Sequence, residues 1–152
     1  MKKTNNKGFS LVELIVVVAI MAVLMVVLGP QLLRNVEKAR IQRDNSAISE
    51  IANAAKIAMA DETVNASIAA GASKTYTAAS GAFDFSTDTD ALTEELEVVI
   101  GAKVQLQASK YKASTTTKII VAKDANGIVS VKGEGLFDQD GSAYGTDGKL
   151  TY

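Results

Sequence analysis

The chain has 152 residues, enough for one domain with a core of its own and too few for two ordinary domains. It contains neither Cys nor His, which excludes disulfide bridges and thiolate chemistry and removes the commonest general base and metal ligand. The formal net charge of −1 hides an acidic stretch, residues 61–152, with 13 acidic and 8 basic residues. This balance argues against binding to nucleic acid, which requires clustered Lys and Arg.

The first predicted element is a membrane-spanning helix. Phe9–Leu28 reads FSLVELIVVVAIMAVLMVVL, in which only Ser10 and Glu13 are polar. As a helix it would extend about 30 Å, the thickness of a hydrocarbon core. The three lysines before it predict a cytoplasmic N-terminus, with the rest of the chain on the other side of the membrane. A secretory signal peptide is the alternative, although its apolar run would be shorter and would end in a small-residue cleavage site.

Glu13 is the feature that a plain membrane anchor does not explain. An ionisable residue in a membrane span costs about 2.5–3.5 kcal/mol near the centre and less near the edge. A partner charge that becomes available in another state would offset this cost. The alternative is a Glu whose side chain snorkels to the lipid headgroups.

Residues 7–14, KGFSLVEL, resemble the prepilin peptidase site of type IV prepilins and of the pseudopilins of type II secretion, proteins with a class III signal peptide. The resemblance implies cleavage between Gly8 and Phe9 and N-methylation of Phe9. It identifies Glu13 as the assembly glutamate, and Pro30 matches the proline that follows the apolar run in this family.

Cleavage would place a positive amine on Phe9, one helical turn from Glu13. In a filament, the carboxylate of one subunit can then pair with the amine of its neighbour, which favours the correct register. The partners implied by the resemblance are identical or homologous subunits in a helical homopolymer, the prepilin peptidase, the pilus assembly platform and the membrane. No nucleic acid is expected as a partner.

Helical periodicity continues beyond the apolar run. Apolar residues recur at three- and four-residue steps between polar ones, which predicts one helix from Phe9 to about Ala60 whose second half is amphipathic. Gly29 and Pro30 interrupt it, and a kink is expected there because proline removes a helical hydrogen bond. In the family reading, Val23–Pro30 unwinds on assembly.

The remainder predicts a soluble domain. Residues 61–90 are rich in Ala, Ser, Thr and Gly and are expected to form a surface loop anchored by Phe83 and Phe85. Asp90 is expected to cap a short helix to about Ile100 whose apolar stripe is Leu92, Leu96 and Val99, and Gly101 to end it.

A sheet is expected within residues 101–152. Strands are predicted at Val104–Ala108, Lys118–Lys123 and Ile128–Lys132, the last two joined by the hairpin signal Asp-Ala-Asn-Gly. The predicted fold is therefore α+β, with a small antiparallel sheet of three to four strands packed on the distal half of a long helix. The predicted segments are a cleaved leader (1–8), a transmembrane assembly helix (9–30), an amphipathic helix (31–60) and a soluble pilin domain (61–152).

The acidic tail is the remaining candidate site. Asp138, Asp140 and Asp147 lie among glycines and resemble part of a calcium loop, but the terminal Glu and the full ligand spacing are missing. Solvated turns are the expected structure, and no cofactor is predicted, with calcium as the alternative.

Three functions follow from these features. The first is a structural subunit of a type IV pilus, held in the cytoplasmic membrane as a precursor and displayed on the cell surface after assembly. The second is a pseudopilin of a secretion or DNA-uptake system. The third, a tethered binding domain that does not polymerise, leaves Gly8, Phe9 and Glu13 unexplained. An enzyme is not expected, because no common nucleophile–base pair can be built without His or Cys.

Overall fold

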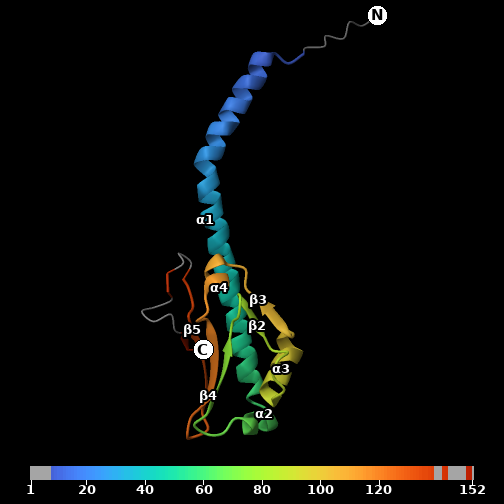
Figure 1. Cartoon of the computed structure of the whole chain (residues 1–152), viewed down its shortest axis with the longest axis vertical. Coiled ribbons are helices and arrows are strands. Elements are labelled where there is room, and N and C mark those ends of the chain that lie inside the picture. Colours follow the sequence, from blue (N-terminus) through green and yellow to red (C-terminus); the bar gives the residue numbers. More distant parts are fainter. Residues whose placement is uncertain (1–7, 139–141, 144–149, 152) are drawn as a thin grey trace, which may run out of the picture. The chain divides into compact units, whose positions relative to one another are not determined.

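The computed structural model describes residues 8–138, 142–143 and 150–151, and Figure 1 shows the arrangement of its helices and strands. The chain divides into two compact units, Met1–Val36 and Glu37–Tyr152. The order of elements confirms the predicted α+β fold, with a long N-terminal helix and a small antiparallel sheet. The helices are α1 (Leu11–Ala58), α2 (Glu62–Ser67), α3 (Ala91–Ile100) and α4 (Ser109–Ala113). The strands are β1 (Ser73–Thr77), β2 (Ala82–Asp84), β3 (Lys103–Gln105), β4 (Lys118–Lys123), β5 (Val129–Glu134) and β6 (Leu150–Thr151).

The part of α1 in the second unit is amphipathic, as its periodicity predicts. Ile41, Ile48, Ile51 and Ala55 are at most 2% exposed, and their spacing places them on one face of the helix. This face contributes to a single hydrophobic core together with residues from the sheet and from α3.

The larger sheet has the strand order β1-β4-β5-β6, and every pairing is antiparallel. The predicted hairpin is confirmed, because β4 pairs with β5 from Lys118 opposite Glu134 to Lys123 opposite Val129. Asp124 closes its turn by accepting hydrogen bonds from the backbone N–H groups of Asn126 (2.8 Å) and Ile128 (2.7 Å).

The prediction of a surface loop over residues 61–90 is wrong. The segment contains α2, β1 and β2. Strand β1 pairs with β4, and β2 pairs with β3 in a separate two-stranded sheet. The strand predicted at Val104–Ala108 is therefore the shorter β3, and it does not belong to the four-stranded sheet. Both pairings join residues far apart in the sequence, which local composition does not reveal. Phe83 and Phe85 are fully buried, as predicted.

Helix α3 has the predicted caps. The Asp90 carboxylate accepts a hydrogen bond from the backbone N–H of Thr93 (3.1 Å), and Gly101, with φ +90°, donates its N–H to the carbonyl of Glu97 (2.9 Å). Leu92 and Leu96 are fully buried. Val99 is 55% exposed, so it is not part of the buried stripe.

A buried carboxylate ties α1 to the segment between β3 and α4. Asp44 is 1% exposed, and its Oδ2 accepts hydrogen bonds from the backbone N–H groups of Gln107 (2.8 Å) and Ala108 (2.7 Å). Nearby, Oε1 of Glu37 accepts one from the backbone N–H of Ser109 (2.5 Å). Two carboxylates of α1, Glu37 and Asp44, therefore accept hydrogen bonds from the three consecutive backbone N–H groups of residues 107–109, which pair with no strand among the described residues.

Asn45 makes a second tie from the same helix. Its Nδ2 donates to the backbone carbonyl of Phe137 (2.9 Å), and its Oδ1 accepts from the hydroxyl of Tyr111. The Tyr111 hydroxyl in turn accepts a hydrogen bond from the backbone N–H of Phe137 (3.0 Å). The rings of Tyr111 and Phe137 pack edge to face, with their centroids 5.2 Å apart. The segment after β5 is thereby fixed to α1 by a closed hydrogen-bond cycle.

Gly135 is required by this packing. Its φ is +68°, and a Cβ added there would lie 2.5 Å from the carbonyl oxygen of Thr116, which belongs to the backbone and cannot give way. We expect Gly135→Ala to lower the free energy of unfolding by more than about 2 kcal/mol. Urea unfolding of the purified protein in detergent, followed by tyrosine fluorescence, would measure the loss.

Gly71→Ala is the matched control, because its φ of +80° is similar and its added Cβ meets no atom within 4 Å. Its free energy of unfolding should fall only by the cost of a positive φ for alanine, about 1–2 kcal/mol. Equal losses in the two variants would show that the close approach to Thr116 does not matter.

Candidate functional site

The residues of the proposed cleavage junction lie before the first helical turn. Gly8, Phe9 and Ser10 are exposed and non-helical, and α1 begins at Leu11. A Cβ added to Gly8 would meet nothing within 4 Å. Nothing within the described subunit therefore requires glycine at this position, so any requirement for it comes from outside the subunit.

Glu13 lies in the first turn of α1. Its Oε2 accepts a hydrogen bond from the backbone N–H of Ser10 at 2.9 Å. Ser10 and Glu13 have the spacing of a capping box, in which the acid satisfies a backbone donor that the helix leaves free. The positive end of the helix dipole also favours a carboxylate here. The carboxylate thus has a partner within its own subunit before any neighbour binds.

The first half of α1 is apolar on all sides. It is long and apolar enough to cross a membrane, with a mean hydropathy of 3.2 over its most apolar 18 residues, none of which is buried. Val26 is 76% exposed and Met25 74%. Exposed apolar surface of this extent requires lipid or other apolar helices around it.

Gly29 and Pro30 lie inside α1, which is helical through both residues. Pro30 has no N–H to donate to the carbonyl of Val26, so this turn lacks one hydrogen bond. The predicted kink and the predicted unwinding on assembly remain predictions.

The acidic tail falls mostly outside the described residues. Asp138 is exposed, whereas Asp140 and Asp147 lie in stretches that the structure does not describe. Within the described ranges, no group of three acidic residues is placed to hold a metal ion. Calcium binding by the tail stays an untested alternative.

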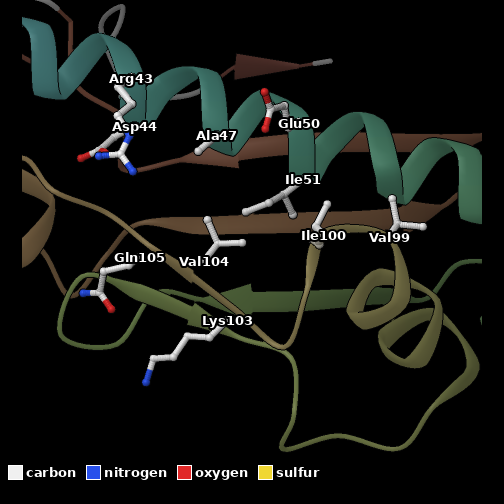
Figure 2. Close-up of a pocket in the computed structure, with 10 residues that line it drawn as sticks. All are labelled: Arg43, Asp44, Ala47, Glu50, Ile51, Val99, Ile100, Lys103, Val104 and Gln105. Carbon is white, nitrogen blue, oxygen red and sulfur yellow. The ribbon is translucent and has the colours of Figure 1, made fainter.

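A pocket in the second unit was not expected from the sequence. It has a volume of about 460 Å³ and lies between α1 and the segment from α3 to β3 (Figure 2). Arg43 and Glu50 come from α1, and Lys103 and Gln105 from β3, with Val99 at the end of α3. Asp44 also lines it, but its carboxylate is engaged by the two backbone donors described above. The pocket is a mixed polar and apolar groove.

A charged network joins β1 to the start of α3. Nζ of Lys74 donates to Asp88 (2.5 Å) and to Asp90 (2.7 Å), and Asp90 also accepts from the hydroxyl of Thr93 (2.7 Å). These hydrogen bonds raise the pKa of Lys74 above its usual range. Burial disfavours the Asp90 carboxylate, but the hydrogen bonds from Lys74 and Thr93 outweigh it and lower the pKa of Asp90. Lys74 therefore stays charged and serves as a structural cation, the opposite of what a lysine base or nucleophile requires.

Residues 3–29 match the family model of the prokaryotic N-terminal methylation motif. No curated protein and no solved structure matches the chain. The matched residues contain Gly8, Phe9 and Glu13, the three positions that the resemblance singled out. The motif implies processing by a prepilin peptidase and indicates a structural subunit rather than an enzyme. Residues 3–29 thus carry the motif that is the hallmark of type IV prepilins with a class III signal peptide, and an apolar helix long enough to cross a membrane overlaps and follows it.

Proposed function

We propose that the chain is a structural subunit of a type IV pilus, cut after Gly8 and polymerised through α1. The observation that carries the proposal is the start of α1, where an exposed non-helical junction precedes a carboxylate at the head of an exposed apolar helix. A neutral Gln could accept the same hydrogen bond from Ser10, so a monomeric anchor would not require a charge in this position. In a helical polymer, the apolar surface is covered by neighbouring helices and the carboxylate can meet the new amine.

Fibres sheared from the cell surface test the pilus against the pseudopilin. Antibodies against this chain should decorate such fibres along their whole length, and deletion of the chain should remove the fibres. A pseudopilin would instead leave the surface fibres unlabelled, and its deletion would abolish secretion or DNA uptake. That second result would overturn the pilus assignment.

Processing at Gly8 gives a separate expected outcome. Gly8→Leu should leave nearly all of the protein as uncut precursor in the membrane fraction, because a bulky side chain would sit directly at the scissile bond. Gly8→Ala, the smallest change, should retain most of the cleavage. Electrophoretic mobility of the membrane-bound chain separates the two forms. Normal maturation of Gly8→Leu would show that the cut lies elsewhere.

A further inference from the structure

Charges of opposite sign gather in two separate parts of the second unit. Residues 84–97 contain six acidic residues and no basic one, whereas residues 118–134, which form β4, β5 and their turn, contain three lysines and two acids, Asp124 and Glu134. In Figure 1, α3 lies to one side of α1, and β4 and β5 lie to the other. The side with α3 is therefore strongly acidic, whereas the side with β4 and β5 has an excess of one lysine.

The outer surface of α3 combines these acids with an exposed apolar residue. Glu94, Glu95 and Glu97 are exposed, and Val98 is 80% exposed. Val98 follows Glu94 by four residues and Glu95 by three, so the three side chains share one helix face. No ion pair engages these glutamates among the described residues. Together the four residues Glu94, Glu95, Glu97 and Val98 form the acidic stripe.

The outer face of the larger sheet carries the complementary arrangement. Ile120 lies opposite Lys132 in the register of β4 and β5, and Lys118 is two residues before Ile120, so all three share one face. The alternate residues Ile119 and Val121 are fully buried, which places this face away from the core. We call Lys118, Ile120 and Lys132 the lysine face. Glu134 lies opposite Lys118 and offsets one of the two lysine charges, so the face has a net charge of one positive unit.

We propose that the acidic stripe of one subunit docks onto the lysine face of a second copy of this chain. An apolar residue surrounded by charges is the usual anatomy of a protein–protein interface, with Val98 meeting Ile120 at the centre and the charges paired at the rim. Contact between two acidic stripes or between two lysine faces would bring like charges together. The favoured contact is therefore heterologous.

A heterologous contact between opposite sides of one domain repeats from subunit to subunit and builds a ring or a helical filament. This interface rests on the proposed pilus function and adds to it the surfaces through which the soluble domains meet. It also makes filament stability sensitive to ionic strength, because rim charges are screened by salt.

Charge exchange in the full-length chain tests the contact. Glu94→Lys with Glu95→Lys, and separately Lys118→Glu with Lys132→Glu, should each reduce the yield of sheared filaments at least about tenfold. The four changes combined should restore most of the yield, because attraction returns with its direction reversed. Lys56→Glu, an exposed change on α1 outside both surfaces, is the control and should leave the yield unchanged.

Cysteine cross-linking then reports the contact directly, since the chain has no native Cys. Glu94→Cys with Lys132→Cys in one chain should give a ladder of cross-linked oligomers in filaments, and either change alone should give none. Filaments of normal yield from the reversed variants, or filaments without a ladder, would overturn the interface and leave the pilus function standing. Dimers from Glu94→Cys alone would show an α3–α3 contact instead. Absence of wild-type filaments would overturn the pilus function itself and the interface with it.

Discussion

Replacement of Glu13 by Ala should abolish filament assembly while leaving mature protein in the membrane. If the Glu13 carboxylate pairs with the Phe9 amine of a neighbour, the change leaves that amine unpaired among apolar helices. Loss of one partner of a buried pair costs about 3–5 kcal/mol, and the loss repeats at every subunit. Membrane insertion should not suffer, because a charge is removed from an apolar segment. The measurement compares the chain in membranes with the chain in sheared filaments.

Glu13→Gln separates the helix cap that the structure shows from the proposed pairing with the Phe9 amine of a neighbour. The amide oxygen can still accept the hydrogen bond from the backbone N–H of Ser10, so the start of α1 is retained while the charge is lost. Assembly should fail in this variant too. Normal filament yield from Glu13→Gln would show that Glu13 acts as a helix cap and not as a partner for the amine.

Replacement of Asp44 by Ala should produce a large loss of stability in the second unit, Glu37–Tyr152. Asp44 is 1% exposed and accepts two backbone hydrogen bonds, from Gln107 and Ala108. Its removal leaves the buried N–H of Ala108 without an acceptor, at about 1–3 kcal/mol, and adds a smaller cost at the part-buried N–H of Gln107. We expect the midpoint of urea unfolding to fall accordingly and the segment between β3 and α4 to become sensitive to protease.

Two further variants control this prediction. Asp44→Asn keeps the size of the side chain and one acceptor oxygen, so it should lower the free energy of unfolding less than Asp44→Ala. Glu37→Ala removes a neighbouring acceptor whose side chain is 29% exposed, so water can replace it at the N–H of Ser109. If Asp44→Ala and Glu37→Ala lowered the free energy of unfolding equally, this would contradict the argument that burial makes the loss of the Asp44 carboxylate more costly.

The parts of the fold that depend on neighbouring residues could be predicted from the sequence. The turn between β4 and β5 consists of four consecutive residues, 124–127, whose conformations are set locally. Asp124 accepts a hydrogen bond from the N–H of Asn126, and Gly127 has a positive φ. The cap of α3 is equally local, since Asp90 bonds to Thr93 three residues later. The apolar run and the periodicity after it predicted a helix from Phe9 to about Ala60, within two residues of the observed ends, Leu11 and Ala58.

The parts that depend on distant partners were missed. Strand β1 is defined by its pairing with β4, and Tyr76 contributes to the core only because that pairing turns it inward. Asp44 did leave a signal that could have been read. It lies three residues after Ile41 and four before Ile48, on the buried face of α1, where an unpaired carboxylate would be costly. The sequence could therefore have suggested that the Asp44 carboxylate accepts hydrogen bonds from buried backbone N–H groups.

At the proposed cleavage junction, the residues were predicted from the sequence motif, and the structure shows their local conformation. Gly8 and Phe9 could be named from the motif, but their position outside the helix and the bond between Glu13 and Ser10 could not. The two surfaces of opposite charge likewise needed the register of the sheet, because Lys132 meets Ile120 only through strand pairing.

The N-terminus of the chain in sheared surface filaments tests the central claim most directly. Intact-mass measurement and N-terminal sequencing of purified fibres should find a subunit that begins at Phe9 and carries one added methyl group. That result requires cleavage after Gly8, modification of the new terminus and incorporation into a surface polymer. A filament subunit that begins at Met1 or beyond Pro30, or fibres that lack this chain, would contradict the claim.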